Sequence, residues 1–162
     1  MEPIRYVDRL NDTYRAQGFP PYRWTVNTEA PFTPLEKPLS ECRVSMLTSG
    51  GISRCSAEPF NAEATNDFRL DAVDKDAPSD DFQIHDAFYD HRDADTDLNC
   101  VFPVDRLREL ADEGVIGSVA PRFWSGFMGR IYKRSVVMKE TAPALVEELH
   151  ADDVDLFLLV PA

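Results

Sequence analysis

Five consecutive apolar residues near the end of the chain, directly after a helical pattern, limit its possible folds more than any other feature. The run is Leu156–Val160, and the helical pattern before it covers Thr141–His150. An uninterrupted apolar run is typical of a strand in a parallel sheet that is covered on both faces. A helix followed by such a strand predicts an α/β protein with an open, mainly parallel sheet flanked by helices.

A second buried strand is predicted over Arg43–Thr48, and the small residues Ser49, Gly50 and Gly51 end it. In open sheets of the Rossmann or flavodoxin type, ligands bind beyond the carboxyl ends of parallel strands. We therefore expect this strand and the strand at 155–160 to be adjacent in the sheet. The turn formed by Ser49, Gly50 and Gly51 is the predicted substrate-binding turn.

The rest of the chain divides into an arm and a domain. Helices are predicted over 4–17 and 104–113, a short strand over 81–85, and loops over 71–81 and 115–132. Residues 19–38 are rich in proline and aromatic residues, which favours an extended arm anchored by its rings. We expect residues 1–41 to form a helix and an arm packed on the domain. Residues 42–162 form the α/β domain, which ends directly after its last strand, as a truncated domain would.

Charge and cysteine content narrow the possible functions. The chain has 29 acidic and 17 basic residues and a formal charge of −12, which disfavours nucleic-acid partners and anionic membrane surfaces. It contains no apolar run of about 20 residues and no secretory signal, so a soluble cytoplasmic protein is predicted. Cys42, Cys55 and Cys100 are expected to be reduced thiols; a Cys42–Cys55 disulfide or a single reactive thiol are the alternatives.

One stretch concentrates the side chains that could carry chemistry. Residues 85–97 hold two His and five Asp among thirteen residues. His and Asp bind divalent metals, and Asp–His pairs tune proton transfer. The stretch is interpreted either as an acid–base or metal site or as a polar loop whose Asp residues cap turns. The predicted catalytic residues are His85, Asp90, His91 and Asp93, with Asn99 as a further substrate-binding candidate and with no metal assigned.

Several segments together resemble a known family. They are Ile4–Arg9, Pro21–Trp24, Pro31–Ser40, His85–Ala94, Asp97–Pro103, Asp105–Leu110 and Glu113–Gly117. In these segments the chain resembles the selenoprotein B family of glycine, sarcosine, betaine and D-proline reductases. The resemblance runs over nearly the whole chain, and the His- and Asp-rich stretch leading into Phe102-Pro103 is its most specific part.

The resemblance implies a cytoplasmic α/β protein of a multi-subunit reductase that cleaves a carbon–nitrogen bond of a small amine or amino acid. It also implies a selenocysteine or cysteine nucleophile just after a strand that resembles Asp155–Val160. The sequence ends at Pro161-Ala162, and none of its three cysteines occupies that place. No cofactor is therefore evident. A selenocysteine codon read as a stop, a truncation, or a subunit with another role would each account for this.

Three hypotheses follow. The first is a reductase subunit that holds a small polar substrate between the 85–97 loop and the 49–51 turn, together with other reductase subunits or a second copy. We expect that form to be inactive as an isolated chain. The second is a non-catalytic binding or assembly module of the same fold. The third is a metal-dependent enzyme that uses the cluster at 85–97.

Overall fold

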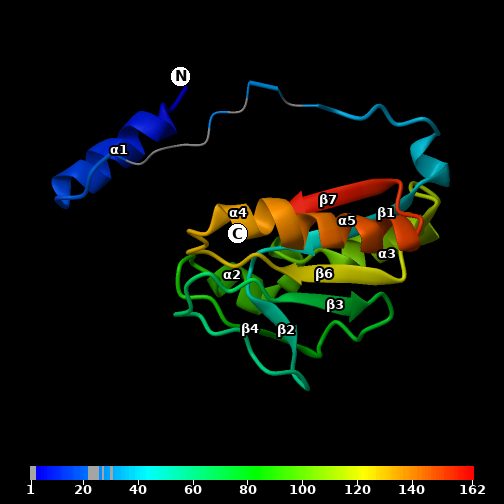
Figure 1. Ribbon diagram of the computed structural model, residues 1–162. Helices are drawn as coiled ribbons and strands as arrows, with labels where there is room; N and C mark the ends of the chain where they lie inside the picture. Colours follow the sequence, from blue (N-terminus) through cyan, green and yellow to red (C-terminus); the bar gives the residue numbers. More distant parts are fainter. Residues whose placement is uncertain (1–2, 22–25, 27, 30) are drawn as a thin grey trace. The chain divides into compact units, whose positions relative to one another are not determined.

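The computed structural model describes residues 3–162 except 22–25, 27 and 30, and it divides into two compact units, residues 1–34 and 35–162. Every strand of the described residues lies in the second unit. That unit is an α/β domain with an open, mainly parallel sheet flanked by helices (Figure 1). The fold class predicted from the sequence is confirmed.

Strand β1 (Arg43–Thr48) is the centre of the sheet. Along one side it pairs in parallel with β7 (Leu156–Val160), from Val44 opposite Leu156 to Thr48 opposite Val160. Along its other side lie β5 (Ser118–Val119) and β6 (Arg122–Gly126), also parallel. Strand β3 (Leu70–Asp74) runs antiparallel to β6 at the far edge. The predicted adjacency of the first and last strands is therefore confirmed.

Alternating side chains of the strands build a core on each face of the sheet. On one face Val44, Met46 and Phe123 pack with α3 (Val104–Asp112). On the other face Leu47 and Trp124 pack with α5 (Ala142–Ala151). Figure 1 shows these two helices on opposite sides of the sheet. The sheet is thus covered on both faces, while its carboxyl edge is left to the loops.

A small antiparallel sheet follows the glycine turn. It consists of β2 (Ile52–Arg54) and β4 (Phe82–Ile84). Short helices of the domain include η1 (Leu39–Glu41), α2 (Arg92–Thr96) and η2 (Leu98–Cys100). The 85–97 segment therefore begins directly after β4 and contains α2.

Two predicted loops are wrong, because strands occupy part of each. The acidic segment 71–81 begins inside β3, where Val73 is buried and Asp71 pairs with Arg69. One buried side chain among charged ones is enough for an edge strand that is solvated on one face. The segment 115–132 contains β5 and β6, and Phe123 and Trp124 face opposite cores. Nearby glycines made that segment look irregular.

The end of the domain also differs from its prediction. Strand β7 pairs with β1 alone among the described residues, so it lies at an edge, and its Leu159 is 63% exposed. The helix before it starts earlier than Thr141. It runs from α4 (Arg134–Val136) through a π-helical turn (Val137–Thr141) into α5. Pro143 lacks an N–H, and a widened turn before it accommodates the missing hydrogen bond.

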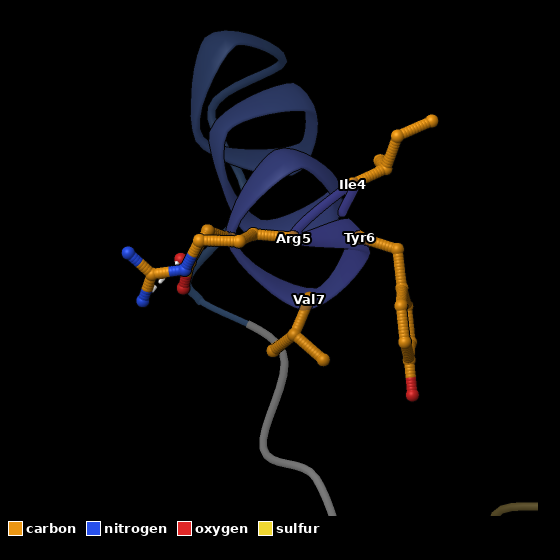
Figure 2. Close-up of a pocket in the computed structure, with 5 residues that line it drawn as sticks. Ile4, Arg5, Tyr6 and Val7 are labelled. Carbon is orange, nitrogen blue, oxygen red and sulfur yellow. Dashed lines mark ion pairs between the residues drawn. The ribbon is translucent and has the colours of Figure 1, made fainter. Parts of the chain in front are cut away.

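In the first unit, α1 (Tyr6–Ala16) confirms the predicted N-terminal helix. None of its residues is buried. Figure 2 shows its first turn, where Ile4, Tyr6 and Val7 project outward and Arg5 pairs with Asp8 at 2.9 Å. The depression at this turn is lined by that one helical turn alone. Tyr22 and Trp24, predicted anchors of the arm, lie outside the described residues. No helix in the described part of the chain has the length and apolar character needed to cross a membrane.

Candidate functional site

The turn at residues 49–51 follows β1 in the chain and is hydrogen-bonded to the carboxyl end of β7. The hydroxyl oxygen of Thr48 accepts a hydrogen bond from the Gly50 N–H at 3.1 Å. The Ser49 N–H donates to the Val160 carbonyl at 3.2 Å, and the Ser49 Oγ accepts from the Ala162 N–H at 3.1 Å. The predicted substrate-binding turn is therefore anchored to two neighbouring strands.

The 85–97 segment closes on this turn through two hydrogen bonds. The Tyr89 hydroxyl donates to the Gly50 carbonyl at 2.9 Å, and the His85 N–H donates to the Gly51 carbonyl at 2.9 Å. The loop therefore lies at the carboxyl end of β1, which is the position expected for it from the sequence. In open sheets this is the edge where ligands bind.

The close approach requires a glycine at position 51 and leaves little space for a side chain at position 50. Gly51 has a φ of +69°, and a Cβ there would lie 2.5 Å from the His85 carbonyl oxygen. A Cβ at Gly50 would lie 3.2 Å from both the Thr48 Oγ1 and the Tyr89 hydroxyl. A side chain at position 51 would push the loop backbone away from the turn, and one at position 50 would press on the Tyr89 hydroxyl.

Sequence reasoning missed Tyr89. Burial raises the pKa of its phenol to about 12, and the nearby Asp86 and Asp95 carboxylates add to the rise. The hydroxyl therefore keeps its proton and remains a donor at physiological pH. An aromatic hydroxyl within a stretch of ionisable residues was the available signal, but the sequence contains no hint of its partner 39 positions earlier.

Among the four predicted catalytic residues, His85 is the one bonded to the turn, through its backbone. Its side chain is partly buried, and its Nδ1 is buried without a hydrogen-bond partner among the described residues. Buried polar atoms of this kind are uncommon. His85 is therefore the predicted catalytic residue whose side chain keeps a polar atom without a partner in the described part of the chain.

The other three predicted catalytic residues lie at the start of α2 and have local partners. His91 Nδ1 lies 2.8 Å from the Asp95 carboxylate. Hydrogen bonds from Arg92 lower the pKa of the Asp90 carboxyl. Asp93 is exposed, and its backbone carbonyl accepts the Asp97 N–H at 2.8 Å. The ring of His91 contacts that of Tyr89 edge-on at a centroid distance of 5.8 Å, which connects this group to the turn indirectly.

Asn99 lies in η2 and contacts the first turn of α3. Its Oδ1 accepts from the Asp105 N–H at 3.1 Å, and its Nδ2 donates to the carboxylates of Asp97 at 2.9 Å and Asp105 at 3.2 Å. The bond from its side-chain amide, together with one from its backbone N–H, lowers the pKa of the Asp97 carboxyl. Both ends of the Asn99 amide are thus engaged by its own neighbours.

Metal ligands and thiols are the remaining groups that could carry chemistry. Within the described ranges, no three His, Cys, Asp or Glu side chains come together in a group that could hold a metal ion. The metal-dependent hypothesis therefore has no ligand set in this part of the chain. All three thiols are free; Cys42 is buried, and Cys55 and Cys100 are exposed.

A shallow apolar depression lies at the same edge, where β1 and β7 end. Its volume is about 360 Å³, and it is lined by Leu47, Ser49, Leu159, Val160 and Pro161. Ser49 supplies its polar group. The edge thus combines an apolar surface, a glycine turn and a loop with ionisable side chains.

Fold and edge together define an α/β domain of the open-sheet class, in which ligand sites lie beyond the carboxyl ends of the strands. Over residues 11–162 the chain matches the family model described as glycine/sarcosine/betaine reductase selenoprotein B, and it belongs to that family. No solved structure matches it significantly.

Relatives of the chain are reductase subunits. It is 34% identical to the D-proline reductase subunit gamma of Acetoanaerobium sticklandii, over 79% of this chain and 52% of that protein. It is 31% identical to the glycine reductase complex component B subunit gamma of Peptoclostridium acidaminophilum, over 76% of this chain and 28% of that protein. The sarcosine reductase complex component B subunit beta of that organism is 33% identical, over 75% and 29%. The chain thus spans about half or less of the length of these relatives.

Proposed function

We propose that this chain is the α/β part of a reductase subunit that binds a small amine or amino acid at the carboxyl edge of β1 and serves its reductive C–N cleavage. The closure of the 85–97 loop on the glycine turn, through Tyr89 and the His85 backbone, carries the proposal. Family membership and relatives named for glycine, sarcosine and D-proline reductases support the substrate class.

In this proposal the residues of the turn and of the loop have different roles. Ser49, Gly50 and Gly51 contact the substrate, and His85 handles a proton. Cleaving a C–N bond to give C–H and N–H consumes two electrons and two protons. The electrons come from a thiolate or selenolate together with a second thiol of the reductase, and these two groups become joined in a disulfide or selenosulfide bond. Asp90, His91 and Asp93 form an outer ionisable group on the loop.

Assembly with other reductase subunits is part of the proposal. The relatives' names describe subunits, and two of them name a reductase complex. We place this assembly in the cytoplasm, where three free thiols stay reduced. The isolated 162-residue chain should show no reductase turnover, because none of Cys42, Cys55 and Cys100 lies directly after β7.

The proposal is tested by titrating the ¹⁵N-labelled chain with glycine, sarcosine and D-proline. We expect chemical-shift changes centred on residues 49–51 and 85–89 for at least one of these probes. His85→Gln should weaken binding or the turnover of the reconstituted complex, by roughly 10²- to 10⁴-fold for turnover if His85 is an acid or base. His150→Gln, on an exposed His of α5, is the matched control and should behave as wild type.

Absence of binding by all three probes at millimolar concentration would overturn the proposal. Shift changes confined to surfaces away from the turn would do the same. A non-catalytic assembly module is the second candidate, and the exposed edge of β7 with its 63% exposed Leu159 favours it. It predicts capture of a reductase subunit together with no probe binding.

A further inference from the structure

The substrate-binding turn contains two consecutive glycines, which creates a conformational problem. Glycine adopts positive and negative φ at similar cost, so a peptide unit between two glycines can flip. A flip reverses the directions of its C=O and N–H groups. A turn that binds a substrate must present those groups in one direction. The Gly50–Gly51 peptide therefore needs a group that holds it.

Tyr89 supplies a contact of this kind. Its hydroxyl donates to the Gly50 carbonyl at 2.9 Å. In a trans peptide the C=O and N–H point in opposite directions, so this bond also directs the Gly51 N–H away from Tyr89. The next peptide is held separately, by the bond from the His85 N–H to the Gly51 carbonyl at 2.9 Å.

The surroundings of this contact leave little room for a substitute donor. A Cβ built on Gly50 would lie 3.2 Å from the Tyr89 hydroxyl, 3.2 Å from the Thr48 Oγ1 and 3.4 Å from the Val101 Cβ. Gly50 itself is buried. Removing the hydroxyl would therefore leave a buried carbonyl without its partner, which is unfavourable.

We propose that Tyr89 is a positioning residue of the substrate site, whose hydroxyl locks the Gly50–Gly51 peptide in the one orientation that binds the substrate. This inference rests on the proposed function. The phenol pKa of about 12 supports it, because the hydroxyl then donates throughout the physiological range. Tyr89 acts through the turn, so it needs no contact with the reacting atoms.

The test compares wild type with Tyr89→Phe, which keeps the ring and removes the hydroxyl. Tyr132→Phe is the matched control, because Tyr132 is 70% exposed. The amide signals of Gly50 and Gly51 and the dissociation constants for glycine, sarcosine and D-proline are measured for each protein. We expect Tyr89→Phe to weaken probe binding by about two- to tenfold. It should also double or broaden the two glycine signals while the rest of the spectrum stays unchanged.

The possible results separate the two proposals. Unchanged affinity in Tyr89→Phe, with single unshifted glycine signals, overturns the role of Tyr89 and leaves the proposed function standing. Failure of wild type to bind any probe overturns the proposed function and this inference with it. If Tyr89→Phe does not fold, Gly50→Ala is the second variant. Its added Cβ would lie 3.2 Å from the Tyr89 hydroxyl and displace the phenol from the Gly50 carbonyl. That variant should weaken binding similarly, and undiminished affinity in it would refute the inference.

Discussion

Replacing Gly51 with alanine tests whether the 85–97 loop closes on the turn. Gly51 has a φ of +69°, and its new Cβ would lie 2.5 Å from the His85 carbonyl oxygen and 3.1 Å from the Met128 Cε. Gly114 offers a matched control, because its φ is +71° and a Cβ there meets no atom within 4 Å. The two substitutions share the backbone strain and differ in the collision.

The expected costs follow from that difference. Left-handed backbone costs an alanine about 1–2 kcal/mol, and a less flexible unfolded chain offsets about 0.4–1 kcal/mol. Gly114→Ala should therefore lower the free energy of unfolding by about 1 kcal/mol or less. Gly51→Ala adds displacement of the His85 backbone, with loss of its hydrogen bond (about 1 kcal/mol) and overpacking (about 1–3 kcal/mol). Its net cost should be about 2–5 kcal/mol.

Urea unfolding followed by circular dichroism measures the free energy of unfolding of both variants, and thermal unfolding measures their melting temperatures. For a chain of this size, about 1 kcal/mol shifts the melting temperature by roughly 2–4 °C, so Gly51→Ala should melt roughly 4–20 °C lower. Costs for the two variants within about 0.5 kcal/mol of each other would refute the reasoning, because the loop would then not approach the turn as described.

Three further predictions concern other parts of the domain. Asp155 accepts from the Arg43 N–H at 2.7 Å and pairs with Lys37, and both contacts lower the pKa of its carboxyl. This stabilisation is present above the unfolded pKa of about 4 and is lost as pH falls through the lower folded value. Asp155→Asn should thus cost about 1 kcal/mol at pH 7, and the difference from wild type should vanish in acid; a pH-independent cost in urea titrations would contradict it. Asn99→Ala removes the acceptor at the start of α3 and should cost about 1 kcal/mol, whereas an unchanged melting temperature would show that the amide is dispensable. The uncharged edge of β7 should make the chain self-associate at tens of micromolar; Leu159→Lys should reduce this in light scattering, and a monomeric wild type would refute it.

Local patterns were sufficient to predict much of this domain. The patterns at 43–48 and 156–160 identify two strands, of which β1 is buried as expected, and their parallel pairing agrees with the helix that precedes the second. The glycines at 50 and 51 mark the turn at the sheet edge, where Gly51 has a positive φ. These features depend on neighbouring residues, since periodicity and turn chemistry act over a few positions.

Contacts between distant residues decided the rest. The position of β7 at an edge depends on which strands β1 accepts as neighbours, and the edge strand β3 is recognisable only once β6 lies beside it. His91 and Asp90 pair with residues of their own helix turn, while Tyr89 reaches Gly50. All three are polar residues of one short stretch, and no local sequence pattern indicates which of them contacts the turn. Their partners depend on how the folded chain places that stretch against β1, because a hydrogen bond requires atoms about 3 Å apart, and only tertiary packing brings such distant positions together.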